Sequence, residues 1–323
     1  MKEILVEAHG GPEQLKLHDS PSQAPGPNHV LVRISAAGVN FMDTGVRRGI
    51  FWADKTPPFV PGVEGAGRIM ALGEGVDNIH VGDRVAWFYI PGSYAEELIA
   101  PTDKLVPIPH DIDDETAAAM MMQGLTASHF VTETYQIKPG DVALVHSSAG
   151  GLGLILTQLI KILGGKVIGR VSTEEKVEIA KKAGADHVIV ESGGNFAKEV
   201  LHLTDDEGVH VVYDGAGAYT FHDSLASLRY HGVLAYYGQA IKRLPPIDLL
   251  DLPKSVLVTY PRVMHHVRTH ETLLARTEQL FDWVRKGQLN IHIGHRYPLA
   301  DAARAHADLE ARKTTGKLLL LTP

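Results

Sequence analysis

The stretch from Asp141 to Lys176 constrains the fold more than any other part of this sequence. It reads as a buried strand, a turn of small residues, an apolar helix over about Leu152–Leu163 and a second buried strand over Lys166–Val171. This order predicts a β-turn-α-β unit. Such a turn lets a pyrophosphate approach bare backbone N–H groups at a helix N-terminus, where the dipole favours negative charge.

The glycine pattern of the turn is incomplete. In the arrangement G-x-G-x-x-G, Ser148 stands in the first position and Gly150 and Gly153 fill the other two. A tight turn that only packs an α/β core would look similar, but the strand before, the helix after and the second strand together favour a dinucleotide site. Its candidate cofactor-binding residues are Ser148, Ala149, Gly150, Gly151, Leu152 and Gly153.

Composition narrows the class of protein. A chain of 323 residues favours two domains. The net charge of -7 and the absence of a basic stripe disfavour nucleic acid as a partner. The N-terminus reads as a strand rather than a signal peptide, and the longest apolar run is too short to span a bilayer, so we expect a cytoplasmic protein. The lack of cysteine excludes disulfides, thiolate catalysis and thiolate-ligated zinc.

The N-terminal part, residues 1 to about 122, reads as mostly β. Short strand candidates separated by glycine and proline turns predict a compact barrel-like unit. They are Ile4–Glu7, Leu15–His18, Val30–Ala36, Gly65–Leu72, Arg84–Phe88 and Ala95–Ile99. Residues 113–135 are helical in composition, and we interpret their run of methionines as flexible core filler rather than a metal or partner surface.

Strands and helices alternate from about residue 123 to residue 260. Six strands with crossing helices predict a doubly wound parallel sheet whose ligand lies at the carboxyl ends of the strands. The tail, with helices over Glu271–Lys286 and Ala300–Ala311 and a last strand over Leu318–Leu321, lacks this alternation. We therefore assign residues 1–122 and 265–323 to one domain and residues 123–264 to the other.

Several motifs resemble those of the quinone oxidoreductase (zeta-crystallin-like) group, the zinc-free branch of the medium-chain dehydrogenase/reductases. The resemblance covers essentially the whole chain in order. The motifs that carry it are residues 36–43 (AAGVNFMD), 61–67 (PGVEGAG), 82–85 (GDRV), 124–127 (GLTA), 147–153 (SSAGGLG), 171–176 (VSTEEK), 212–215 (VYDG) and 315–319 (TGKLL). The resemblance implies a GroES-like mostly-β domain, a Rossmann domain, NADPH as cofactor and commonly a homodimer.

A metal is not expected. Zinc-dependent members of this superfamily use cysteine and histidine ligands, whereas here Asn40 stands near the cysteine position and Val63 at the histidine position. Glu64 alone cannot hold a metal. The pairs His265-His266 and His292/His295 are coincidences expected among 18 histidines.

Without zinc or a thiolate, oxidation of an alcohol has no evident proton acceptor, whereas reduction of an electron-poor acceptor needs mainly orientation and exclusion of water. The leading hypothesis is an NADPH-dependent quinone reductase that transfers hydride from NADPH to a quinone. The alternatives are an NADPH-dependent enone or alkenal double-bond reductase, which also needs a proton for the α-carbon, and a crystallin-like structural or RNA-binding protein.

The resemblance also implies the remaining site residues. Asn40 and Asp43, in a loop after the third strand candidate, are the catalytic candidates; Asn40 can equally be a turn residue, and Asp43 can simply pin the loop. The implied cofactor contacts outside the glycine turn are Asn40, Thr126, Gly238, Gln239 and Lys317. Departures from the family pattern at Gly45, Phe51 and Tyr260 leave the substrate open.

Cofactor choice can be predicted from the end of the second strand of the nucleotide domain. An NAD enzyme places a carboxylate there, but this strand ends with Val171, Ser172 and Thr173. The two hydroxyls, with Lys176 on the first turn of the next predicted helix, Glu174–Ala183, and Arg170 as a further cation, predict a site for the 2′-phosphate of NADPH. Lys176 can instead be a solvated helix lysine, and Glu191 stands where the family often has a tyrosine on that phosphate. Finally, the apolar run 255–260 at the sheet edge predicts a homodimer.

Overall fold

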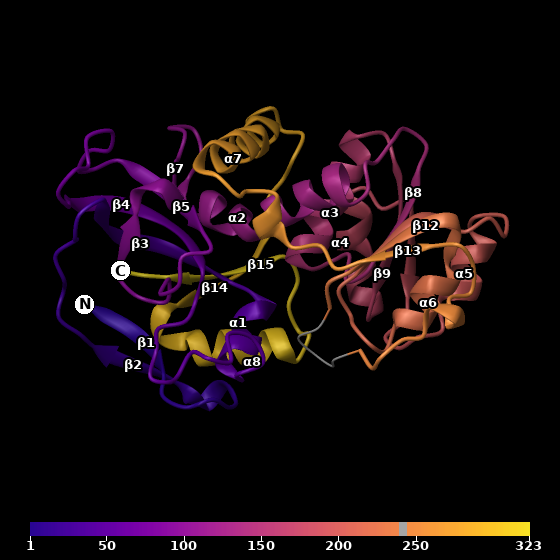
Figure 1. The fold of residues 1–323 in the computed structure, drawn as a ribbon, viewed down its shortest axis with the longest axis horizontal. Coiled ribbons are helices and arrows are strands. Elements are labelled where there is room, and N and C mark those ends of the chain that lie inside the picture. The colour runs from indigo at the N-terminus through magenta and orange to yellow at the C-terminus, as the bar shows by residue number, and fades with distance from the viewer. Residues whose placement is uncertain (239–243) are drawn as a thin grey trace. The chain divides into compact units, whose positions relative to one another are not determined.

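We describe the protein from a computed structural model, which describes residues 1–238 and 244–323. The chain divides into two compact units (Figure 1). Unit 1 comprises Met1–Gln123, Val267–Gly287 and Ile291–Pro323. Unit 2 comprises Gly124–His266 and Gln288–Asn290.

Unit 1 is built on a seven-stranded sheet in the order β14-β15-β3-β4-β5-β7, with β6 also paired to β3, and a separate β1-β2 hairpin. Strand β15, from the end of the chain, runs antiparallel to β3 and parallel to β14. The strands are β1 (Lys2–Val6), β2 (Leu15–Asp19), β3 (His29–Val39), β4 (Glu64–Leu72), β5 (Arg84–Phe88), β6 (Glu97–Pro101), β7 (Leu105–Pro107), β14 (Ile293–Pro298) and β15 (Lys317–Leu321).

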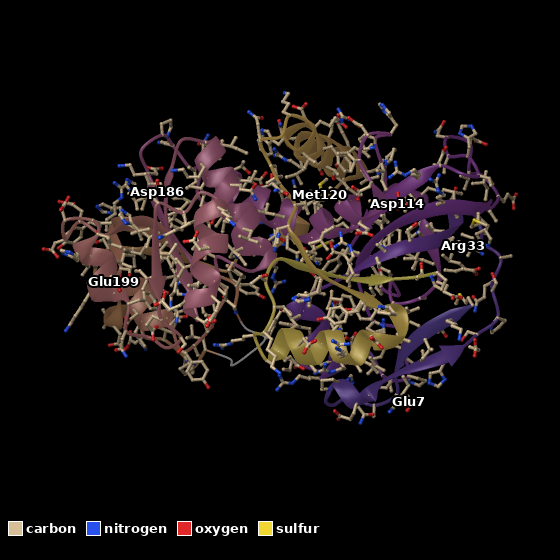
Figure 2. The ribbon with its side chains drawn as sticks, turned by 180° about the vertical axis from the view of Figure 1, so that it is seen from behind. Glu7, Arg33, Asp114, Met120, Asp186 and Glu199 are labelled. Carbon is tan, nitrogen blue, oxygen red and sulfur yellow. The ribbon has the colours of Figure 1, made fainter. Side chains whose placement is uncertain are left out.

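Unit 1 also holds the helices α1 (Phe41–Arg47), α7 (His270–Arg285) and α8 (Ala302–Glu310). Helix α2 (Asp114–His129) continues into a π-helical turn, Phe130–Thr134. Met120 of α2 is fully buried, as expected of a core filler (Figure 2).

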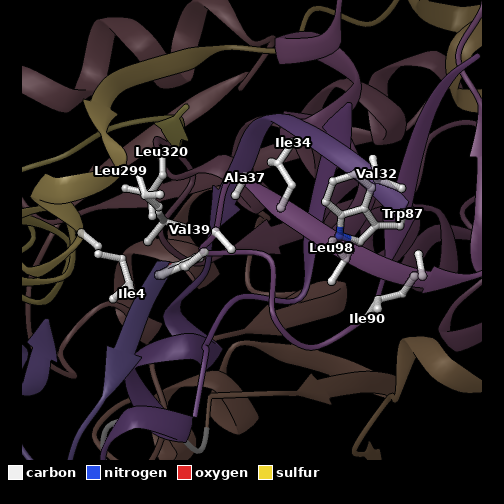
Figure 3. Packing of buried hydrophobic residues seen from close by; sticks show 14 of the residues in the cluster. Ile4, Val32, Ile34, Ala37, Val39, Trp87, Ile90, Leu98, Leu299 and Leu320 are labelled. Atoms are coloured by element: carbon white, nitrogen blue, oxygen red, sulfur yellow. The ribbon is translucent and has the colours of Figure 1, made fainter. Parts of the chain in front are cut away.

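Alternation along the strands forms the core of unit 1. Val32 and Ile34 of β3 point to the same side as Trp87 of β5 and Leu98 of β6, and all four are buried (Figure 3). The indole N–H of Trp87 donates to Ser93 Oγ at 2.9 Å, which satisfies the one polar atom of this large side chain. The mostly-β unit expected from the sequence is therefore present.

Unit 2 has a six-stranded parallel sheet in the order β10-β9-β8-β11-β12-β13. This is the doubly wound order, which reverses between β8 and β11, and it confirms the predicted Rossmann sheet. The strands are β8 (Val142–Val145), β9 (Lys166–Val171), β10 (His187–Val190), β11 (Val209–Asp214), β12 (Leu228–Tyr236) and β13 (Leu257–Thr259). The helices are α3 (Gly151–Ile162), α4 (Val177–Lys182), α5 (Ala197–His202) and α6 (Phe221–Ala226).

Several elements differ from the sequence prediction, among them the short strand β7, which was not expected. The segment holding Asn40 and Asp43, expected to be a loop, is the start of helix α1. Strand β14 was not expected, because its sequence IGHRYP is polar and its pairing with β15 shifts register between Ile293 and His295. In the described part of the chain, no helix has the length and apolarity that a membrane crossing requires.

Candidate active site

The glycine turn after β8 is formed as expected. Ser147 has a φ of +51°, and the Gly150 N–H donates to its carbonyl at 2.8 Å, which closes the turn. The buried Ser148 takes the place of the usual first glycine, and its N–H donates to the Arg170 carbonyl of β9 at 3.0 Å. Serine is therefore tolerated here because its side chain packs inside the sheet.

Gly153 shows why the helix after the turn needs a glycine. A Cβ at this position would overlap the carbonyl oxygen of Ser147 and lie 2.6 Å from Ser148 Cα, both backbone atoms. At Gly150, by contrast, the nearest atom to an added Cβ is 3.2 Å away. The N–H groups of the first turn of α3 have no intrahelical acceptor. The turn and the helix start thus have the shape and the donors that a dinucleotide pyrophosphate needs.

The end of β9 brings Ser172 and Lys176 together. Lys176 Nζ donates to Ser172 Oγ at 3.3 Å. Lys176 lies at the end of a 3₁₀ turn, Glu174–Lys176, one residue before α4 begins, and not inside the α-helix that the sequence predicted. Thr173 precedes this turn and is exposed. A cation and a hydroxyl group therefore meet at the end of β9, where an NAD enzyme of this fold carries a carboxylate for the ribose 2′-hydroxyl.

Arg170 does not join this group. Its Nη2 donates to Glu191 Oε2 at 3.0 Å and to the Gly193 carbonyl at 2.5 Å, and its side chain is buried. The sequence predicts that Arg170 is a further cation for the phosphate. In the structure its guanidinium is instead paired with Glu191. Glu191, the departure noted above, is turned toward Arg170.

In unit 1, Asn40 belongs to a buried polar cluster. Its Nδ2 donates to Glu64 Oε1 at 2.7 Å, and its Oδ1 accepts from Gln123 Nε2 at 2.7 Å and from Lys317 Nζ at 3.0 Å. Lys317 Nζ also donates to Gln123 Oε1 at 2.8 Å and pairs closely with Glu64. Glu64 is completely buried, and Asn40 and Lys317 are each 3% exposed. The orientation of the Asn40 carboxamide is therefore fixed.

These contacts engage all three N–H donors of the Lys317 ammonium. A contact between this ammonium and a cofactor phosphate, which the resemblance implied, requires one of the three hydrogen bonds to break. The second N–H of the Asn40 amide is not engaged by these neighbours. It is the donor that Asn40 can offer to a bound molecule.

Asp43 contacts the backbone of Asn40 and not its side chain. Its Oδ2 accepts from the Asn40 backbone N–H at 2.8 Å, as in a capping box, and from Tyr94 Oη at 3.0 Å. Burial raises the pKa of Asp43 to about 7, although the Asn40 N–H and the charge of Lys317 act in the opposite direction. The carboxyl group thus holds the start of α1 and thereby the position of Asn40.

A second set of buried groups continues from Tyr94. Its hydroxyl lies 3.0 Å from His306 Nε2, and His306 Nδ1 lies 3.0 Å from Arg47 Nη1. Burial, together with Arg47, lowers the pKa of His306 to about 3. The neutral ring accepts from Arg47 at Nδ1 and donates from Nε2 to Tyr94. Arg47 then pairs with Glu310 at 2.9 Å.

The remaining candidates are placed as follows. Thr126 is half-buried on α2, and Gly238 is buried after β12, where an added Cβ would lie 2.5 Å from the backbone of Gly215 and of Gly217. Gln239 lies outside the described residues.

Two departures from the family pattern form one packing feature. A Cβ at Gly45 would overlap the ring of Phe51, so the position of this ring requires glycine at residue 45. Tyr260, the third departure, follows β13 and packs against Arg262, whose Cζ lies 5.6 Å from the ring centroid.

Sequence reasoning missed several members of the unit 1 cluster as functional neighbours, chiefly Gln123, Tyr94 and His306. Glu64 was considered only as a metal ligand. Its position could have been recognised from the sequence, because Glu64 is a lone carboxylate at the start of an apolar strand. A carboxylate buried in such a strand has to be paired. Among residues 1–238 and 244–323, no group of three or more histidine, aspartate or glutamate side chains is arranged to hold a metal.

Comparison with known proteins agrees with this geometry. Residues 26–110 match the alcohol dehydrogenase GroES-like domain, and residues 151–284 match the family described as zinc-binding dehydrogenase. The chain is 41% identical to the quinone oxidoreductase of Pseudomonas aeruginosa, over 99% of each chain. The chain belongs to the quinone oxidoreductase family. This is the zinc-free branch of the medium-chain dehydrogenase/reductases.

One further relative and one solved structure are also similar to this chain over nearly its full length. A 2-haloacrylate reductase from a Burkholderia species is 37% identical over 98% of both chains. The crystal structure of Escherichia coli quinone oxidoreductase complexed with NADPH superposes with a TM-score of 0.96, at 35% identity, covering 99% of this chain and 100% of that one. The predicted pairing of a GroES-like unit with a Rossmann unit is confirmed.

Proposed function

We propose that this chain is an NADPH-dependent quinone reductase that transfers hydride from NADPH to a quinone without a metal. The observation that carries the proposal is the end of β9, where Lys176 and Ser172 meet and neither position 171 nor position 172 is a carboxylate. An NAD enzyme uses a carboxylate at this place to bind the ribose 2′-hydroxyl. The NADPH complex of the Escherichia coli relative supports the same cofactor here.

The two parts of the chain take different roles in this proposal. Residues 123–264 form the NADPH-binding domain, and residues 1–122 and 265–323 form the substrate or catalytic domain. The proposed cofactor contacts are Asn40, Thr126, Ser148, Ala149, Gly150, Gly151, Leu152, Gly153, Ser172, Thr173, Lys176, Gly238, Gln239 and Lys317.

When bound, the nicotinamide supplies the hydride. The protein binds and orients the cofactor and the quinone and excludes water from them. The N–H groups at the start of α3 hold the pyrophosphate, and Lys176 and Ser172 hold the 2′-phosphate. Asn40 is the proposed catalytic contact, through the N–H that its neighbours leave unengaged. Asp43, also a catalytic candidate, holds Asn40 in place through the capping contact. Little acid catalysis is needed, because a quinone accepts hydride to give a stabilised phenolate.

Cofactor choice is the first test of this proposal. We expect kcat/KM for NADPH to exceed that for NADH by at least roughly tenfold, because one charge-assisted contact to phosphate contributes about 1.5–3 kcal/mol. Lys176→Ala should remove most of this ratio and leave NADH turnover nearly unchanged. Lys182→Ala, an exposed lysine in the last turn of α4, is the matched control and should keep the ratio. Equal use of both cofactors by the wild-type protein contradicts the proposal.

The second candidate function is reduction of an activated double bond. The observation that favours it is the 37% identity to the 2-haloacrylate reductase of Burkholderia. A steady-state comparison of benzoquinones with enones and 2-haloacrylates separates the two functions. A clear preference for the double-bond substrates would replace the first function by the second.

We also propose that the protein is a cytoplasmic homodimer that binds no nucleic acid. Strand β13 lies last in its sheet, and Leu257 and Val258 on it are 64% and 44% exposed, as an edge that pairs with a second copy requires. Light scattering at micromolar concentration should give the mass of a dimer, and a monomer would refute this. The net charge of -7 disfavours the RNA-binding alternative; tight RNA binding without NADPH binding would restore it.

A further inference from the structure

Glu191 is a carboxylate at a place where a phosphate is expected to bind. It follows β10, and its N–H donates to the Val171 carbonyl at 2.9 Å, so Glu191 continues the β10–β9 pairing beyond Val190 and Val171. The next residue after Val171 is Ser172, the partner of Lys176. A free negative charge this close to the lysine would oppose the 2′-phosphate of NADPH, because like charges within a Debye length of about 8 Å repel.

Both carboxylate oxygens of Glu191 are engaged in hydrogen bonds within the protein. Oε2 accepts from Arg170 Nη2 at 3.0 Å, and Oε1 accepts from the Gly193 N–H at 2.6 Å. Burial raises the pKa of Glu191, but the Gly193 N–H and Arg170 outweigh it and lower the pKa. Glu191 is therefore ionised at neutral pH, and its charge is balanced by the guanidinium of Arg170.

Arg170 itself is fixed on its other sides. Its Cζ lies 4.9 Å from the centroid of the Phe196 ring, and its Nη1 lies 3.4 Å from His146 Nδ1. Burial lowers the pKa of His146 to about 4. The neutral ring accepts from Arg170 at Nδ1, while Nε2 lies 3.2 Å from Ser224 Oγ. A neutral neighbour leaves the full charge of Arg170 for Glu191.

Stability alone does not explain this pair. The Nε of Arg170 is buried without a hydrogen-bond partner, which costs free energy, and an ion pair in which one partner is buried and the other partly buried is often no more stable than an apolar replacement. The backbone carbonyl of Arg170 accepts from Ser148 of the glycine turn. One residue of β9 thus contacts the pyrophosphate turn with its backbone and balances Glu191 with its side chain.

We propose that Arg170 is a positioning residue for cofactor specificity: it neutralises and holds Glu191, so that the Lys176–Ser172 end of β9 accepts a ribose 2′-phosphate. The inference rests on the proposed NADPH dependence and deepens it. It assigns a different role to a residue that the sequence predicts to contact the phosphate directly, and whose guanidinium instead pairs with Glu191.

The test measures binding of two ligands that differ only in the 2′-phosphate. Isothermal titration calorimetry compares adenosine 2′,5′-bisphosphate with adenosine 5′-monophosphate, and the ratio of the two affinities is the readout. Arg170→Met should lower this ratio by roughly tenfold, since an unpaired carboxylate then faces the phosphate. Arg170→Lys, which keeps the charge, and the double variant Arg170→Met/Glu191→Gln should both stay within about threefold of the wild-type ratio.

The control is a second ion pair of the same unit. Lys161 Nζ contacts Asp186 Oδ1 at 2.8 Å near the far end of α3 (Figure 2 labels Asp186), about 15 Å along the helix from Gly151. Lys161→Met should leave the ratio unchanged. A merely structural role of Arg170 would weaken both ligands equally and leave the ratio unchanged too, which would overturn the inference. If Arg170→Met does not fold, Arg170→Gln replaces it. A fall in the affinity ratio for Arg170→Gln then supports the role given to Arg170, and an unchanged ratio contradicts that role.

The two proposals fail in different ways. A wild-type protein that binds both ligands equally contradicts the NADPH dependence itself. A wild-type protein that prefers the bisphosphate, together with an Arg170→Met variant of unchanged preference, contradicts only the role given to Arg170.

Discussion

Gly153→Val is expected to lower the affinity for NADPH by at least roughly 100-fold while the secondary structure is retained. A side chain at Gly153 would overlap the Ser147 carbonyl oxygen and crowd Ser148 Cα. Because both are backbone atoms, the clash cannot be relieved by a rotamer change, and the turn and the helix start have to separate. The N–H groups at the start of α3 then no longer converge on one phosphate.

NADPH fluorescence titration measures the effect, and far-UV circular dichroism checks the fold. Gly26→Ala, where an added Cβ meets nothing within 4 Å, is the remote control. Unchanged affinity in Gly153→Val would remove the cofactor from this turn.

The Rossmann unit could be predicted because its signals are local. Strand, turn, helix and strand follow within about thirty residues, and the observed β9 and β10 have the predicted bounds, Lys166–Val171 and His187–Val190. Each buried parallel strand is a short apolar run between a glycine or polar turn and a helix. The order of the strands then follows from right-handed crossovers.

Helix α1 was missed although its start carries a recognisable pattern. Asn40 and Asp43 are spaced as an N-cap residue and its N3 partner, and the Asp43 side chain does accept the Asn40 N–H. Gly45 within the helix and its length of seven residues obscured the pattern. The reason for this glycine is the ring of Phe51, a tertiary contact that no local rule contains.

The Arg170–Glu191 pair could not be predicted for a different reason. Which way two side chains on neighbouring strands turn depends on the Phe196 ring and on the Gly193 backbone, which are distant in sequence from Arg170. The sequence showed a cation and a carboxylate near one phosphate site and left their interaction open.

Lys317→Met is expected to lower the free energy of unfolding by about 3–5 kcal/mol, the cost of leaving one member of a buried ion pair without its partner. Glu64 is 0% exposed and would keep only the Asn40 and Met122 N–H donors. Urea unfolding without cofactor measures the loss, so that any contact of Lys317 with NADPH cannot contribute to it. Lys286→Met breaks the exposed pair with Asp282 instead and should cost less than about 0.5 kcal/mol.

The double variant Glu64→Gln/Lys317→Met identifies the cause of this loss. Because it removes both charges, it should recover more than half of the free energy lost in Lys317→Met, as expected when the cost is an unpaired charge rather than lost packing. Gly38 leaves room for this carboxylate, since a Cβ there would lie 2.5 Å from Glu64 Oε1. A double variant as unstable as Lys317→Met would mean that the ammonium acts by filling space. It would also mean that the orientation of Asn40 does not depend on the charge of Lys317.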